Sequence, residues 1–296
     1  MNSLLKYFYN ISNVKIIYHN NYYSFNYQGY AYKLYMLEEI IDDNFLINVN
    51  KNMLGSTLVS EIIFNNDRKI ISSYNNKQYL LIKIFVNPSK NISLEEINYL
   101  SNSLTTKRLN INWGLLWSRK IDYLEDLINE NGKKYPIITD SFNYFVGLAE
   151  NAISYYNNVV IENDYTYFIN HKTIRIDDTI ESLYNPLNII FDYKVRDVAE
   201  YIKISFFRDN KNVFNELNAY LINNQLTLTD IKLLIARLLY PSFYFELYED
   251  ILVNNNSELI LASIIDKTSE YEKYLASVIN YLRRWYDVDE ILWLKN

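Results

Sequence analysis

Short apolar or aromatic runs alternate with polar pairs over the first ninety residues, and this pattern predicts β-strands. Asn20-Asn21 and Gln28-Gly29 separate the first runs and are turn signals. Two later runs flank Tyr74-Asn75-Asn76-Lys77, which predicts a hairpin. The predicted strands are Val14 to Tyr18, Tyr22 to Tyr27, Tyr30 to Leu37, Lys69 to Ser73 and Gln78 to Phe85. We therefore expect a small antiparallel sheet, with a helix within Glu38 to Leu54.

From Ser93 onward the apolar positions recur with a helical period. Ser93-Leu94-Glu95-Glu96 has the spacing of a capping box, Thr229 is expected to cap a later helix, and Pro241 to end it. Four apolar stripes predict core-facing helices: Trp117, Ile121, Leu124 and Ile128; Phe145, Leu148, Ala149 and Ala152; Ile231, Leu234, Ile235 and Leu238; and Tyr271, Leu275, Val278, Leu282 and Trp285. Asn87-Pro88 closes the β-rich region, which places a boundary near residues 87–92 and divides the chain into residues 1–90 and 91–296.

Two apolar runs within the helical region end in polar residues that can carry chemistry. Tyr165 to Ile169 is followed by Asn170-His171-Lys172-Thr173, and Ile189 to Phe191 stops at Asp192. Arg196-Asp197 then opens a helix whose apolar face is Val198, Ile202 and Phe206. A carboxylate beside apolar neighbours is costly unless a cation, a metal or N–H donors meet it, so Asp192 requires a partner.

The composition is ordinary for a soluble globular protein, with 49% apolar and 22% charged residues. The unusual feature is 30 Tyr against 5 Gly and 4 Pro. A tyrosine-rich surface would suit cross-linking in a protein shell. The joint abundance of Asn, Ile, Lys, Tyr and Phe favours the codon bias of an AT-rich genome instead.

Charge and residue types exclude several classes of function. A net charge of −6 without a Lys or Arg run argues against nucleic-acid binding. The chain has no Cys and only two His, which excludes thiolate sites and leaves oxygen ligands for any metal. No segment approaches the roughly 18 apolar residues of a membrane span, so we expect synthesis in the cytosol.

A β-rich lobe, a helical lobe and then the His171 and Asp192 segments in that order resemble the aminoglycoside phosphotransferase and protein-kinase superfamily. The closest resemblance is to the spore-coat-associated kinase-like family of the YutH and CotS type. Four segments carry it: WGLLWSRKIDYLEDL from Trp113, DSFNYFVGLAENAISY from Asp140, FDYKVRDVAEYIK from Phe191 and ARLLYPSFYFELYED from Ala236. The resemblance implies an α+β, two-lobed protein-kinase-like fold with a small antiparallel β N-lobe and a mainly α-helical C-lobe.

The resemblance also implies positions for the phosphoryl-transfer machinery. Lys33, in Gly29-Tyr-Ala-Tyr-Lys33, looks like the lysine that binds the donor phosphates, although a solvated strand lysine fits equally well. Lys83 is a weaker rival on a later strand. Asp192 occupies the position of the aspartate that binds Mg²⁺.

The catalytic loop departs from the family pattern. Thr173 stands where the superfamily has its catalytic Asp after His171, and Asp178 stands in place of the metal-binding Asn. A Thr hydroxyl cannot act as a general base near neutral pH. Asp177 or Asp178 could substitute if the loop were repositioned. The first hairpin carries Asn20 to Tyr23 in place of a glycine-rich loop, which hinders close approach to phosphates.

The other selected residues have structural interpretations. His171 is expected to pack and to bond backbone near the Asp192 strand, and Arg196 and Asp197 to form a scaffold pair. Glu150 and Asn151 are expected on a solvated helix face. Trp113, Trp117, Trp285 and Trp293 are expected to be packing anchors.

These observations lead to three hypotheses. The first is a catalytically degenerate kinase-like protein, a pseudokinase, that binds other spore coat proteins and needs no cofactor. The alternative is an active phosphotransferase that uses Mg²⁺ and ATP on a small-molecule or protein hydroxyl. The third is a two-lobed interaction protein unrelated to spores. A location in the spore coat follows from the family resemblance alone.

Overall fold

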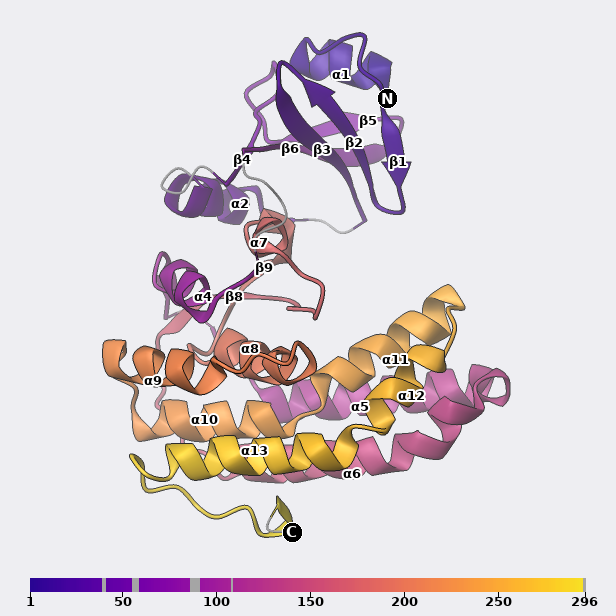
Figure 1. Cartoon of the computed structure of the whole chain (residues 1–296). Helices are drawn as coiled ribbons and strands as arrows, with labels where there is room; N and C mark the ends of the chain where they lie inside the picture. Colours follow the sequence, from indigo (N-terminus) through magenta and orange to yellow (C-terminus); the bar gives the residue numbers. More distant parts are fainter. Residues whose placement is uncertain (39–40, 55–58, 86–90, 108, 295–296) are drawn as a thin grey trace. The chain divides into compact units, whose positions relative to one another are not determined.

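The computed structural model describes residues 1–38, 41–54, 59–85, 91–107 and 109–294, which form two compact units (Figure 1). The first, called the β unit here, comprises residues 1–104, 171–173 and 177–190. The second, the helical unit, comprises residues 105–170, 174–176 and 191–296. Most of the predicted boundary at residues 87–92 lies outside the described residues. The β unit continues past it to Leu104 and includes the segment after His171.

The β unit is built on a six-stranded sheet with the order β1-β2-β3-β6-β4, and β5 also pairs with β6. Its strands are β1 (Ile17–His19), β2 (Tyr22–Tyr27), β3 (Tyr30–Leu37), β4 (Ser60–Ile62), β5 (Ile71–Tyr74) and β6 (Lys77–Ile84). The pairs are antiparallel, which confirms the predicted sheet. Two tight hairpin turns have positive φ angles at their central residues. These are Gln28 and Gly29 (49° and 81°) in the first turn and Asn75 and Asn76 (50° and 59°) in the second.

A helix that the sequence pattern did not predict, α1 (Asn2–Tyr9), covers one face of this sheet (Figure 1). Leu4, Leu5 and Phe8 of α1 are buried against sheet residues that include Tyr32 and Leu34 of β3. At eight residues, α1 is too short to be stable alone, so this packing stabilises it. Because side chains alternate along a strand, Lys33 points to the opposite face of the sheet.

The remaining helices of the β unit are short: α2 (Asp43–Val49), η1 (Asn50–Leu54), α4 (Leu94–Ser101), α7 (Ile180–Leu183) and η3 (Pro186–Asn188). The helix predicted within Glu38 to Leu54 is confirmed for α2 and η1. Asp42 caps α2, and its carboxylate accepts from the backbone N–H of Asn44 at 2.9 Å. Ser93 caps α4 by accepting from the N–H of Glu96 at 3.3 Å, which confirms the Ser93 half of the predicted capping box.

The helical unit contains most of the α-helices and a small sheet of order β7-β8-β9 (Figure 1). Its elements are β7 (Thr105–Thr106), α5 (Trp113–Asn131), η2 (Gly132–Lys134), α6 (Pro136–Asn157), β8 (Tyr167–His171), β9 (Ile189–Asp192), α8 (Arg196–Phe207), α9 (Val213–Asn223), α10 (Leu228–Leu239), α11 (Ser242–Asn254), α12 (Leu259–Ile265), α13 (Thr268–Leu282) and η4 (Leu292–Leu294). The first two β9 residues and the last β8 residue fall in the β unit. Among the described residues, no helix has the length and apolar content to cross a membrane.

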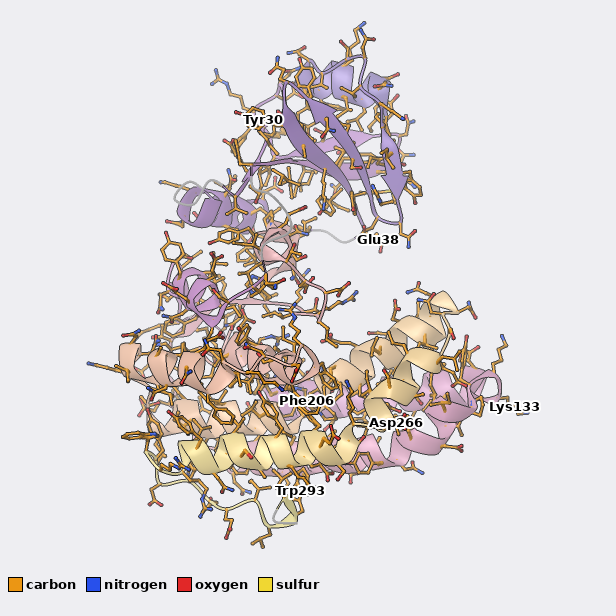
Figure 2. All side chains as sticks on the ribbon, in the orientation of Figure 1. Tyr30, Glu38, Lys133, Phe206, Asp266 and Trp293 are labelled. Atoms are coloured by element: carbon orange, nitrogen blue, oxygen red, sulfur yellow. The ribbon has the colours of Figure 1, made fainter. Side chains whose placement is uncertain are left out.

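The predicted apolar stripes form the core of the helical unit, except that Ile128 is half-buried and Trp285 is exposed. Those of α6 and α10 are fully buried, and Phe206, labelled in Figure 2, lies with its ring centroid 5.3 Å from that of Tyr271 in α13. Trp113 and Trp117 are buried as predicted. The prediction for Trp285 was wrong: α13 ends at Leu282, and Trp285 is 67% exposed. The helical spacing continues in the sequence after the helix itself has ended.

The cap of α10 also differs from the prediction. Thr227, not Thr229, is the N-cap, and it forms a reciprocal capping box with Asp230. Thr229 instead donates from its hydroxyl to the carbonyl of Val160 at an exposed position. Pro241 follows the helix end, as predicted.

This cap provides the first testable prediction. Thr227→Ala should lower the free energy of unfolding by about 1 kcal/mol, because the backbone N–H of Asp230 loses its acceptor, the Thr227 hydroxyl. Thr229→Ala is the matched control and should change it by less than about 0.5 kcal/mol. Urea unfolding followed by circular dichroism measures both, and equal effects of the two substitutions would contradict the assignment of the cap.

Candidate functional site

The predicted phosphate-binding lysine lies at the centre of the sheet in the β unit. Lys33 of β3 lies between Ser24 of β2 and Ile82 of β6. Its Nζ forms an ion pair with the carboxylate of Glu181, from α7, and lies 4.8 Å from the centroid of the Tyr22 ring. The side chains of Lys33 and Glu181 are 23% and 16% exposed, so the pair is largely shielded from solvent. Lys33 is therefore not the solvated strand lysine of the alternative interpretation.

A cavity of about 360 Å³ adjoins this ion pair within the β unit. Ala31 and Ile84 contribute apolar lining, Ser24 and Asn26 contribute polar groups, and Lys15 contributes a second cation. The volume lies at the lower end of the range for small-molecule pockets. The lining therefore combines apolar side chains with two lysines and the Glu181 carboxylate.

The rival lysine is on the other face of the same sheet. Lys83 follows Ile82 on β6, and successive side chains of a strand point to opposite faces. Its Nζ lies 3.7 Å from the centroid of the Tyr30 ring and 4.7 Å from that of Phe85. Lys83 does not line the cavity that Lys33 borders.

The residues of the predicted catalytic loop are held by backbone contacts within the β unit. His171 is 1% exposed, and its Nε2 lies 2.7 Å from the carbonyl oxygen of Leu183. Asn188 accepts from the N–H of Thr173 at 3.2 Å and donates to its carbonyl at 2.9 Å. The loop after His171 is therefore clamped at Thr173. Further along it, Asp177 is exposed and Asp178 is half-buried.

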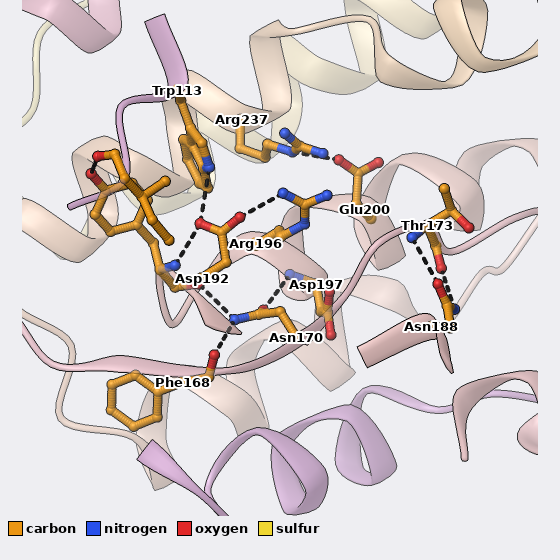
Figure 3. A network of polar contacts seen from close by, with 12 residues as sticks. Trp113, Phe168, Asn170, Thr173, Asn188, Asp192, Arg196, Asp197, Glu200 and Arg237 are labelled. Atoms are coloured by element: carbon orange, nitrogen blue, oxygen red, sulfur yellow. Dashed lines mark hydrogen bonds and ion pairs between the residues drawn. The ribbon is translucent and has the colours of Figure 1, made fainter. Parts of the chain in front are cut away.

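The predicted metal-binding carboxylate has several donors around it in the helical unit (Figure 3). Oδ1 of Asp192 accepts from the indole Nε1 of Trp113 at 3.0 Å and from the N–H of Tyr193 at 2.7 Å. Oδ2 accepts from the guanidinium of Arg196 at 2.5 Å. Asp192 is 2% exposed, so these donors supply the partner that a buried carboxylate requires. The sequence pattern paired Arg196 with Asp197, whereas its ion pair here is with Asp192.

Asn170, to which the sequence pattern assigned no role of its own, connects β8 to the helix that follows Asp192 (Figure 3). Its side-chain amide donates to the carbonyl of Tyr193 at 3.1 Å and accepts from the N–H of Asp197 at 3.2 Å. Asp197 is at the N-terminal end of α8, as predicted, and is buried. An Asn at the end of an apolar strand was the only sequence signal for this role.

A second buried cluster joins α8 to α10 and α11. Glu200 accepts from Lys203 at 2.9 Å, from Nε of Arg237 at 2.6 Å and from the Ser242 hydroxyl at 2.7 Å. Lys203 is 0% exposed and also donates to the carbonyls of Arg237 and Tyr240, each at 3.1 Å. The spacing of Glu200 and Lys203 is also that of a surface pair on one helix, so the sequence pattern did not indicate that the pair is buried.

Burial and charge shift the pKa values of this cluster in opposite directions. Burial opposes the ionisation of Glu200, but Lys203 and Arg237 outweigh it and lower the pKa of Glu200 to about 2. Burial lowers the pKa of Lys203 to about 8. Burial, followed by the negative charge of Glu200, raises the pKa of Glu246 in α11 to about 7. The cluster therefore holds Glu200 as a carboxylate.

The residues around Asp192 do not fit a magnesium site in this arrangement. Mg²⁺ needs several oxygen ligands in an octahedral geometry, and a guanidinium at 2.5 Å from Oδ2 repels a dication. Among the described residues, no group of three or more Asp, Glu or His side chains is arranged to hold a metal. Asp192 as a metal ligand remains a prediction, and its contacts are those of a structural carboxylate.

A sequence profile of the family described as "Spore coat putative kinase YutH" matches residues 2–278. The chain belongs to this family. The YutH-family chain is also 27% identical over 192 residues to the Endospore coat-associated protein YutH of Bacillus subtilis. That alignment covers 57% of this chain and 56% of the relative, so the match spans little more than half the length of the relative.

Solved structures of phosphotransferases share the fold of this YutH-family chain. An aminoglycoside phosphotransferase from Alicyclobacillus acidocaldarius superimposes with a TM-score of 0.62 at 10% identity, over 91% of each chain. A spectinomycin phosphotransferase in complex with ADP and spectinomycin superimposes with a TM-score of 0.59 at 12% identity, over 99% of this chain and 95% of that one. These likenesses confirm the predicted α+β kinase-like fold.

Proposed function

We propose that this YutH-family protein is a catalytically degenerate kinase-like protein that acts by binding, in the endospore coat or during its assembly. The observation that carries the proposal is the state of Asp192. Its two oxygens accept from Trp113, Tyr193 and Arg196, so a metal ion would have to displace Arg196 from a buried pair. Breaking such a pair is costly because it leaves a buried charge without its partner.

The residue at the position of the catalytic base supports the same proposal. Thr173 has no side-chain group that titrates near neutral pH, and loss of a general base typically reduces a rate by about 100- to 10,000-fold. Both backbone polar groups of Thr173 are bonded to the Asn188 side chain. This clamp opposes a shift of the loop that would bring Asp177 or Asp178 into the position of the base.

Family membership supports the coat as the place of action. The Bacillus subtilis relative is described as endospore coat-associated. We propose that this protein is likewise made in the cytosol and binds other proteins of the coat. The third hypothesis, an interaction protein unrelated to spores, is set aside because the profile covers residues 2–278.

A nucleotide titration tests the proposal. ATP should bind the wild-type protein weakly and with the same affinity in Mg²⁺ and in EDTA, because Asp192 is not available to a metal. Isothermal titration calorimetry measures the affinity, and labelled ATP with coat extracts measures transfer, which should match a protein-free blank. Two results together would contradict the proposal: Mg²⁺ strengthens ATP binding, and the wild type transfers phosphate. Lys33→Met should then abolish the transfer, and Asp67→Asn, a control at an exposed position of the β unit, should retain it.

One observation favours the alternative, an active phosphotransferase that uses Mg²⁺ and ATP. Asp177 is exposed, Asp178 is half-buried, and both are in the segment after Thr173. If either is the base, Asp177→Asn or Asp178→Asn should reduce transfer by at least about 100-fold. The absence of any transfer by the wild-type protein would exclude this alternative.

A further inference from the structure

A segment from the later part of the chain covers the face of the sheet that carries Lys33 in the β unit. Three contacts hold it there, from Lys33, Tyr35 and Ser60. Glu181 pairs with Lys33, the Asn185 side chain donates to the Tyr35 hydroxyl at 3.4 Å, and the Ser60 hydroxyl donates to the Tyr184 carbonyl at 2.8 Å. Burial, followed by the charges of Glu181 and Tyr22, raises the pKa of Tyr35. Two of these contacts, at Tyr184 and Asn185, therefore hold the segment next to the Lys33–Glu181 ion pair.

Glu181 also forms part of the cavity wall. Among the described residues that line the cavity, Glu181 is the one carboxylate, and Lys15 and Lys33 are the cations. A phosphate group that approaches Lys33 meets a lysine whose charge is already compensated, and it meets the negative charge of the carboxylate as well. Like charges placed together at a binding site oppose the wrong ligand, so the carboxylate discriminates between ligands by charge.

We propose that Glu181 is an internal competitor for Lys33, which makes the cavity select against ligands that carry phosphate groups. This inference rests on the proposed function, in which Lys33 does not serve phosphate transfer. Glu181, the side chain that determines this specificity, comes from the segment after the loop that contains Thr173. A neutral ligand can occupy the apolar part beside Ala31 and Ile84 without disturbing the ion pair.

Removal of the carboxylate tests the inference directly. We expect Glu181→Gln to bind inorganic tripolyphosphate and ATP, both in EDTA, at least about tenfold more tightly than the wild type, which is about 1.4 kcal/mol. Adenosine should bind the two proteins equally. Adding Lys33→Met to Glu181→Gln should remove the gain. A gain with tripolyphosphate assigns the effect to the phosphate group itself, and a gain with ATP alone assigns it to phosphate presented on a nucleoside.

Two controls keep the test decisive. Asp67→Asn removes one negative charge from an exposed position of the β unit outside the cavity, so an equal gain there would overturn the inference. Unchanged tripolyphosphate affinity in a folded Glu181→Gln would overturn it as well.

The inference and the proposed function can fail separately. The affinities of Glu181→Gln and the wild type are compared in EDTA, where no metal-dependent transfer takes place. The difference between them therefore reports on the ion pair alone. Phosphate transfer by the wild type in Mg²⁺ reports on the function alone. Because both side chains of the pair are partly exposed, Glu181→Gln is expected to fold, and thermal unfolding of both proteins checks this.

Discussion

Replacing Glu200 with alanine is expected to lower the free energy of unfolding by about 3 to 5 kcal/mol, the range measured when a buried charge loses its partner. The substitution leaves the fully buried Lys203 ammonium and the Arg237 guanidinium without their carboxylate. Urea unfolding followed by circular dichroism measures the change. Glu125→Ala, at an exposed position of α5, is the matched control and should have an effect within about 0.5 kcal/mol.

A double-mutant cycle separates the ion pair from general disruption of the core. Glu200→Ala combined with Lys203→Met should cost less than the sum of the two single substitutions, because the second removes the stranded charge. Additive effects would contradict the interpretation that the cost arises from charge. A cost below about 1 kcal/mol for Glu200→Ala would show that water reaches the cluster.

The Glu200 contribution also has a predicted pH dependence. Its pKa is lowered from an ordinary value of 4.5 to about 2 in the folded protein. The unfolded chain therefore binds more protons between these two values, and the stabilisation is lost as the pH falls through them. The difference in stability between wild type and Glu200→Ala should be full between the ordinary value and about pH 8, above which Lys203 loses its proton, and should shrink below the ordinary value.

The second large effect is expected at Asp192. Asp192→Ala should lower the free energy of unfolding by about 3 to 5 kcal/mol, because it removes the carboxylate that pairs with the Arg196 guanidinium and leaves the Trp113 indole N–H without its acceptor. Chemical unfolding measures it, with Asp122→Ala at an exposed position of α5 as the control. A neutral effect on stability, with a loss of Mg²⁺-dependent ATP binding, would show that Asp192 serves a metal and not the fold.

This prediction affects how functional assays of Asp192 variants are interpreted. A loss of any activity in Asp192→Ala has two causes, a missing metal ligand or a destabilised helical unit, and only the stability measurement separates them. Lys33 variants reduce this ambiguity, because the side chains of Lys33 and Glu181 are 23% and 16% exposed, whereas Asp192 is 2% exposed. For this reason the tests of the proposed function and of Glu181 rest on Lys33 variants.

Periodicity predicted most elements because burial of one face imposes it. The strands Tyr22–Tyr27 and Tyr30–Leu37 have the predicted bounds, and the stripe from Ile231 to Leu238 is fully buried. Helix ends were less predictable. Thr227 and Thr229 are equally good caps by type, and the chain's path before α10 decides between them. Trp285 has the helical spacing of the apolar residues in α13, but it lies after the end of that helix.

The candidate site divides in the same way between sequence and structure. The resemblance to the kinase superfamily predicts that Thr173 stands in place of a catalytic aspartate. The sequence by itself determined that Asp192 follows an apolar run and must find a partner, because residue chemistry and the local apolar pattern do not depend on distant contacts. Only the tertiary structure decided which groups are those partners. Trp113 is 79 residues from Asp192, and Glu181 reaches Lys33 from a different segment of the β unit. Long-range packing leaves no local pattern in the chain, so the sequence does not show that Asp192 and Lys33 form ion pairs inside the protein.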